Sequence, residues 1–151
     1  MARRLIDLRS LTDPIDLQKL REYLIDLYGY ASLKVTAAVV ETTDATTTTL
    51  LTLPLEDNKT TQIVADVVAR RTGGSAGTAG DGASYRRIGT FYRVSAGSAT
   101  LIGSLSTPHT AESQGGWECT LTASGNDVLV RITGATNNNV SWGGLVTLQR
   151  I

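Results

Sequence analysis

The stretch TTQIVADVVARR, residues 60–71, decides the fold class of this chain. Its apolar and polar side chains alternate with a period of two, which is the pattern of a β-strand with one buried face. The apolar face is expected to hold Ile63, Ala65, Val67 and Ala69, and the opposite face Gln62, Asp66 and Arg70. The same period governs the chain from Leu33 onward, so most of this protein is predicted to be β-structure.

Seven further stretches are predicted to be strands, separated by turns at intervals of roughly ten residues. They are residues 34–43, 46–55, 85–94, 99–105, 117–123, 127–133 and 140–151. Gly125-Asn126 predicts a hairpin, and residues 136–139 a polar turn. Strands and helices do not alternate after residue 34, which argues against Rossmann and flavodoxin-type enzymes. We predict a mainly β fold, an antiparallel β-sandwich (jelly-roll-like) of about eight strands.

Glycine and charge divide the chain into two parts. Only Gly29 precedes residue 73, and the other 14 glycines follow it. Residues 1–34 hold 11 of the 28 charged side chains and most of the helical patterning. We therefore predict an N-terminal arm and amphipathic helix over residues 1–34, for docking or oligomerisation, and a β-sandwich knob domain over residues 35–151.

The N-terminal helix has start and stop signals. Asp13 is a suitable N-cap, Pro14 suits the first helical position, and Gly29 suits the left-handed end of a helix. Between them the leucines follow a 3-4-3 spacing, typical of a helix–helix seam. This oligomer or docking seam comprises Leu17, Leu20, Leu24 and Leu27. Two interpretations stay open: the helix lies across the β domain, or several copies pack their seams around a shared axis.

The composition of the 151-residue chain excludes several function classes. Lys plus Arg equals Asp plus Glu at 14 each, which argues against a nucleic-acid binder. A single Cys and a single His exclude a disulfide framework and a multi-cysteine zinc site. No apolar run is long enough to span a membrane, so we expect no membrane insertion and synthesis in a reducing cytoplasm. The 22 threonines favour strands.

Catalytic chemistry has little support in this sequence. A relay could be written from His109 with Ser106 or Ser113 and Glu112, but no nucleophile-elbow sequence accompanies it. Cys119 is in phase with neighbouring apolar positions, which favours a core residue. The glycine-rich residues 73–82 precede a predicted strand, so a flexible hairpin tip is favoured over a phosphate loop. We expect no catalytic residue, no metal site and no cofactor, and therefore no enzyme.

Arginine pairs and tryptophans are the remaining candidates for contact with a partner. Arg70-Arg71 and Arg86-Arg87 flank the same loop, so a hairpin should cluster them near its base. The alternatives are a solvated face, a contact with a carboxylate-bearing neighbouring subunit, and a contact with glycan or nucleic acid, in that order. Trp117 and Trp142 suit the core of a sandwich or a sugar-stacking platform, and the scarcity of other large aromatic residues favours the core.

Several short segments occur in an order that is known from one protein family. They are ETTDAT (41–46), LPLEDN (53–58), VADVVARR (64–71), GDGASY (80–85), GW (116–117), LVRITGA (129–135) and VSW (140–142). In this order the stretch from Val40 to Gln149 resembles a β-domain of structural proteins of tailed bacteriophages. The resemblance covers over two-thirds of the chain, and none of its motifs is catalytic.

The resemblance implies a compact sandwich knob of a fibre, spike or head-decoration subunit, commonly in threefold assemblies. We expect a non-enzymatic virion protein, a homotrimeric capsid decoration, head fibre or short fibre protein attached through its N-terminal segment. Its partners would be copies of itself and capsid or tail proteins of the phage. The alternative is a tail-fibre knob that binds a carbohydrate receptor on the host. Because about 35 residues precede the domain, we expect a short decoration protein, head fibre or adaptor-type knob and not a long receptor-binding fibre.

Overall fold

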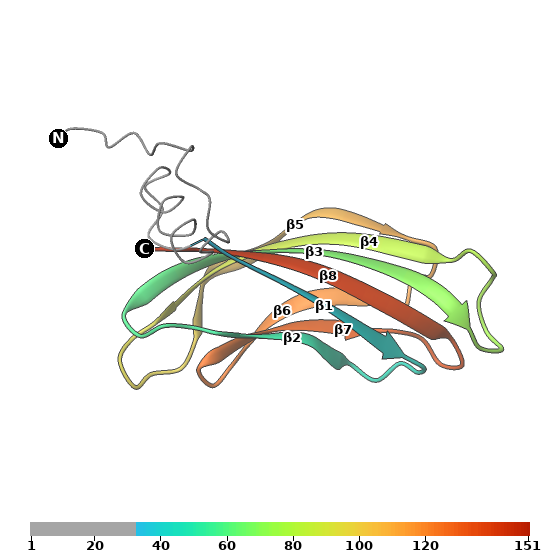
Figure 1. Cartoon of the computed structure of the whole chain (residues 1–151), viewed down its shortest axis with the longest axis horizontal. Coiled ribbons are helices and arrows are strands. Elements are labelled where there is room, and N and C mark those ends of the chain that lie inside the picture. The colour runs from blue at the N-terminus through green and yellow to red at the C-terminus, as the bar shows by residue number, and fades with distance from the viewer. Residues whose placement is uncertain (1–32) are drawn as a thin grey trace, which may run out of the picture. The chain divides into compact units, whose positions relative to one another are not determined.

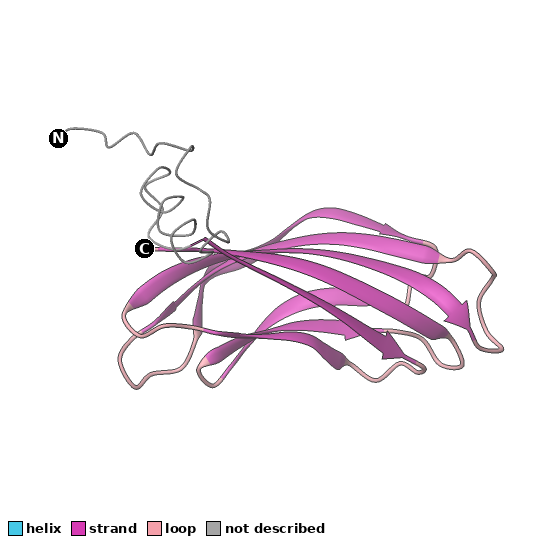
Figure 2. Cartoon of the chain, in the orientation of Figure 1, coloured by secondary structure: helices cyan, strands magenta, loops and turns pink. Residues whose placement is uncertain are grey.

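The computed structural model of this protein describes residues 33–151, which form eight β-strands joined by loops (Figure 2). The predicted N-terminal helix and its leucine seam lie outside the described residues and stay predictions. Within residues 33–151 the structure contains no helix long and apolar enough to cross a membrane. The strands are β1 Leu33–Thr42, β2 Thr48–Pro54, β3 Lys59–Gly73, β4 Gly82–Arg93, β5 Thr100–Glu112, β6 Glu118–Ser124, β7 Asp127–Thr133 and β8 Asn139–Arg150. The prediction of a mainly β fold with about eight strands is confirmed.

The strands form two antiparallel sheets that face each other (Figure 1). The first has five strands in the order β1-β8-β3-β4-β5, and the second has three in the order β2-β7-β6. Buried side chains of both sheets belong to one apolar cluster. The five-stranded sheet thus buries one face, its inward face, and presents the other, its outward face, away from the second sheet.

The predicted alternation of apolar and polar side chains in residues 60–71 is observed as buried and less buried positions in β3. Ile63, Ala65, Val67 and Ala69 are all buried between the sheets. The same period appears in β7, where Val128, Val130 and Ile132 are buried and their neighbours are only half-buried. Because side chains on a strand point to alternate faces, this pattern is enough to define the buried face of each strand.

Turn chemistry fits the two connections that the sequence singled out. Gly125 has a φ of 55° at the first position of the two-residue loop between β6 and β7, where glycine is favoured in tight hairpins. Asn137 has a φ of 59° in the polar turn that precedes β8. The first turn joins two paired strands of one sheet, and the second leads from the three-stranded sheet to the five-stranded one.

The strand predicted over residues 99–105 is longer than expected. Residues 106–112 also belong to β5, which pairs with β4 as far as Glu112. The register shifts between the Arg86 and Ile88 pairs, and Pro108 lies in the irregular part of β5 opposite them. An edge strand has only one neighbour, so it tolerates proline, irregularities and exposed polar side chains. A period of two is therefore not visible there.

We expect the core to be sensitive to the loss of methyl groups. Val130 is fully buried, so Val130→Ala should lower the free energy of unfolding by about 2 kcal/mol. Val94, which is 55% exposed after β4, provides a matched control, and Val94→Ala should change it by less than about 0.5 kcal/mol. Urea unfolding followed by tryptophan fluorescence measures both. Equal effects of the two variants would contradict the assigned core.

Candidate functional site

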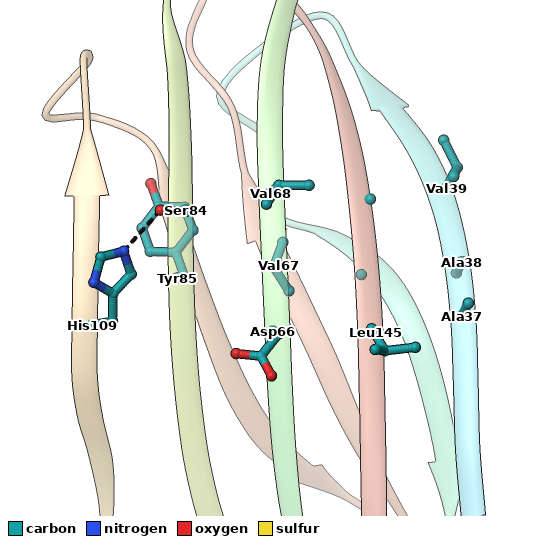
Figure 3. A pocket seen from close by; sticks show the side chains of 12 residues that line it. Ala37, Ala38, Val39, Asp66, Val67, Val68, Ser84, Tyr85, His109 and Leu145 are labelled. Carbon is teal, nitrogen blue, oxygen red and sulfur yellow. Dashed lines mark hydrogen bonds between the residues drawn. The ribbon is translucent and has the colours of Figure 1, made fainter.

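An open groove crosses the outward face of the five-stranded sheet (Figure 3). Its volume is about 510 Å³, and residues of β1, β3, β4, β5 and β8 line it. Val39, Val68 and Leu145 provide its apolar part, while Ser84 and His109 lie at its polar end. Alternate residues of each strand point to this face, so the strand order and register decide which side chains line the groove.

The polar end of the groove contains a hydrogen-bonded serine–histidine pair. Ser84 Oγ lies 2.8 Å from His109 Nε2, between adjacent strands β4 and β5. Asp66 of β3 lines the same groove, and its carboxylate accepts hydrogen bonds from Arg86. The Arg86 Nε atom is 3.0 Å from Asp66 Oδ1, which completes an ion pair on the exposed face.

This pair has the separation of a nucleophile and its base, but among residues 33–151 no carboxylate orients the histidine. Catalytic serines also need a group that orients the histidine and donors that stabilise an oxyanion. Among residues 33–151, no carboxylate hydrogen bonds to His109, and Asp66 is engaged by Arg86. The described residues therefore arrange a polar patch here and not a complete catalytic triad.

The relay residues considered from the sequence take other partners. Glu112 accepts a hydrogen bond from the Tyr85 hydroxyl at 2.7 Å, and Ser113 Oγ accepts one from the Gly82 amide at 3.3 Å. Ser84, the residue that does contact His109, was not singled out. It lies 25 positions away in the sequence, so only the pairing of β4 with β5 could have identified it.

The four arginines do not cluster, contrary to the prediction. Arg70 pairs across the hairpin with Gly82, whereas Arg86 pairs with Asp66, four residues further from the loop. At ~3.3 Å per residue, Arg70 and Arg86 are therefore separated by roughly 13 Å along the strands. Their side chains also differ in direction, because Arg70 and Arg86 are exposed while Arg87 is buried.

Arg87 is a buried structural residue. It is 7% exposed, and its Nε donates to the Cys119 carbonyl at 2.7 Å. Its Nη1 donates to the His109 carbonyl and to Thr110 Oγ1. The guanidinium also lies 4.9 Å from the centre of the Tyr85 ring, a cation–π arrangement. Arg87 therefore ties β4 to β5 and to the second sheet, and it is not available to a partner.

Arg71 stabilises the glycine-rich loop that follows β3 through hydrogen bonds to its backbone. Its guanidinium donates to the carbonyls of Gly74 and Ala76, at 2.7 and 2.9 Å. The Asp81 carboxylate accepts from the Thr78 amide and from the Gln114 side chain. The next element is the strand β4, so the helix N-terminus that a phosphate loop requires is missing at this point. The loop is a hairpin connection held by its own side chains.

Both tryptophans lie in the core. Trp117 is 3% exposed and Trp142 is fully buried, with ring centres 5.7 Å apart. Trp142 Nε1 donates to Thr42 Oγ1 at 2.9 Å, and its ring stacks with Tyr85. A sugar-stacking platform needs an exposed ring face, so neither indole serves as one in this fold. The core interpretation of both residues holds.

Cys119 is buried in the same region, as its phase in the sequence indicated. Burial raises the pKa of its thiol to about 11; the nearby Arg87 acts in the opposite direction, and Glu118 raises it further. A raised pKa leaves little thiolate at neutral pH, which makes a nucleophilic role unfavourable. Burial and the bond to Glu112 raise the pKa of the Tyr85 hydroxyl as well. Among the described residues, no group of three or more His, Cys, Asp or Glu is placed to hold a metal ion.

Comparisons with known proteins find structural similarity only. No protein-family model and no curated protein sequence matches this chain. The tailspike protein of Acinetobacter baumannii phage AM24 is similar with a TM-score of 0.50 at 9% identity, over 78% of this chain and 26% of that chain. The tailspike of Acinetobacter phage vB_ApiP_P1 has a TM-score of 0.38 at 15% identity, over 79% and 22%. This chain thus spans about a quarter of the length of these tailspikes. The first similarity shows a shared β fold.

The two neighbouring arginines of β4 should differ sharply in their effect on stability. Arg87→Ala removes the donor to the buried Cys119 carbonyl and to the partly buried His109 carbonyl, and should cost roughly 3 kcal/mol of unfolding free energy. Arg86→Ala removes only an exposed ion pair, and the loss should stay within about 1 kcal/mol. Urea unfolding of both variants tests this. A larger loss for Arg86→Ala would refute the structural role of Arg87.

Proposed function

We propose that this chain is a structural module of a tailed-phage virion, located in the tail. The observation that carries the proposal is the fold shared with part of the AM24 tailspike, over 78% of this chain. The order of sequence segments from Val40 to Gln149 supports a phage structural protein independently. Together they favour a tail component over the capsid-decoration and head-fibre roles that the sequence alone suggested.

The proposed role is non-enzymatic. It is supported by the incomplete surroundings of the Ser84–His109 pair and by the buried, protonated thiol of Cys119. The module would act as a compact, stable domain, with residues 1–34 attaching it to the particle. We further propose a homotrimer, in which the leucine seam Leu17, Leu20, Leu24 and Leu27 joins the copies. Phage tail proteins would be its other partners.

Immunogold electron microscopy tests the proposed location. Antibodies raised against residues 33–151 should label the tails of particles of the phage that encodes this chain. Labelling of the head would instead support a capsid-decoration protein and overturn the tail assignment. Particles that carry no label, although the antibody recognises the denatured protein from infected cells, would overturn the virion proposal. Preabsorbed antibody serves as the control.

Host-glycan binding is the alternative function. Trp117 and Trp142 are buried and cannot contact a glycan. A glycan would therefore have to bind at the polar end of the groove, which contains Ser84 and His109. A purely structural module should bind no polysaccharide extracted from the host surface, as measured by biolayer interferometry. Binding that disappears in a Ser84→Ala, His109→Ala double variant with unchanged folding would favour the alternative. The exposed pair Thr122→Ala, Ser124→Ala on the other sheet is a matched control.

A further inference from the structure

The outward faces of the two sheets differ in character. Seven large apolar side chains are exposed within residues 36–151, and none of them lies on the three-stranded sheet. Five lie on strands of the five-stranded sheet: Val39, Val68, Tyr92, Ile102 and Leu145. The outward positions of β6 and β7 are mainly polar or charged, and the one apolar residue among them, Leu129, is half-buried. Scattered apolar residues are normal on a protein surface, but a one-sided distribution marks a contact surface.

Strand register gathers three of these side chains into one patch. Gly143 of β8 pairs with Val39 on one side and with Val68 on the other. In the adjacent row, Leu145 pairs with Ala37 and Asp66. Val39 is 74% exposed, Val68 61% and Leu145 49%. We call these three residues the outward patch; Figure 3 shows them on neighbouring strands.

Charge on this face is balanced at short range. Asp66 and Arg86 form an ion pair beside the outward patch, and their side chains are half exposed. A face with one acid and one base side by side carries no net charge there and can meet its own copy without like-charge repulsion. In a symmetric contact the Asp66 of one copy would meet the Arg86 of another, so the face is electrostatically self-complementary.

The size of the face suits a contact between copies. Five strands at ~4.8 Å spacing span ~24 Å, and seven residues at ~3.3 Å span ~23 Å. A face of these dimensions would bury roughly 550 Å² on each copy, or about 1,100 Å² in total, which reaches the lower range of specific protein interfaces. The groove is open, and a broad apolar surface of this shape fits a second protein surface better than a small enclosed ligand.

We propose that the outward face of the five-stranded sheet is a contact surface for a second copy of this chain, with the outward patch at its centre. This inference rests on the proposed role as an assembly module. Because a contact of one face with the same face on another copy is twofold, it would join copies from different seam-linked homotrimers. Val39, Val68 and Leu145 would be the apolar anchors. The Asp66–Arg86 pair would align the copies at the margin of the patch.

Light scattering coupled to size exclusion tests this proposal on the full chain. The wild type should have a mass that is a multiple of 16.0 kDa at high concentration and should dissociate on dilution. Val68→Asp with Leu145→Asp places two charges in the patch and should weaken association at least tenfold. The control variant Val94→Asp with Ile151→Asp adds the same charges at two exposed apolar positions outside the strands. It should leave association unchanged.

Near-ultraviolet circular dichroism of the buried tryptophans checks that each variant is folded. If the charged pair unfolds the domain, Val68→Thr with Leu145→Gln replaces it, and weakened association is again expected. A wild-type mass of one chain, or an unchanged dissociation constant in a folded patch variant, would overturn the proposal. If immunogold labels the tails but the patch variant associates as tightly as the wild type, only the proposed contact surface is refuted. If the patch variant associates more weakly but the particles carry no label, only the proposed tail role is refuted.

Discussion

The packing of Trp142 against Trp117 is the contact on which this sandwich depends most. Trp142 comes from β8 in the five-stranded sheet, and Trp117 immediately precedes β6 in the three-stranded sheet. The pair therefore joins the two layers through the largest side chains of the core. Tyr85 stacks with Trp142, and Arg87 lies over Tyr85, so a continuous series of contacts runs from one sheet to the other. Within this series the Trp142 indole donates to Thr42, and the Tyr85 hydroxyl donates to Glu112.

This arrangement explains why several residues of types that often carry function are buried here. Trp117, Trp142, Tyr85, Cys119 and Arg87 all help to hold the layers together. A buried arginine is tolerated because four oxygen acceptors and a ring face surround its guanidinium. The outward face of the five-stranded sheet presents the outward patch together with polar and charged side chains such as His109 and the Asp66–Arg86 pair. Such a surface suits assembly more than chemistry.

Much of the fold could be predicted, but little of the candidate site. The alternation in residues 60–71 and 127–133 identified both the strands and their buried faces, because one buried face imposes a period of two. The same logic failed for residues 106–112, since an edge strand with polar exposed positions carries no such period. It also failed for Arg86 and Arg87, which are adjacent in sequence yet have opposite environments. His109 was noted, but its partner Ser84 depended on a pairing that no local pattern encodes.

The amino-acid sequence is enough to predict the β class, the approximate strand boundaries, the tight turn at Gly125 and the core positions of the tryptophans and Cys119. These are local properties, set by side-chain period, backbone preference and size. The choice of neighbouring strands and of their register, in contrast, is made in the folded structure. That choice brought Val39, Val68 and Leu145 into one patch and placed Ser84 against His109, because contacts across a sheet depend on pairing between segments that lie far apart in the chain.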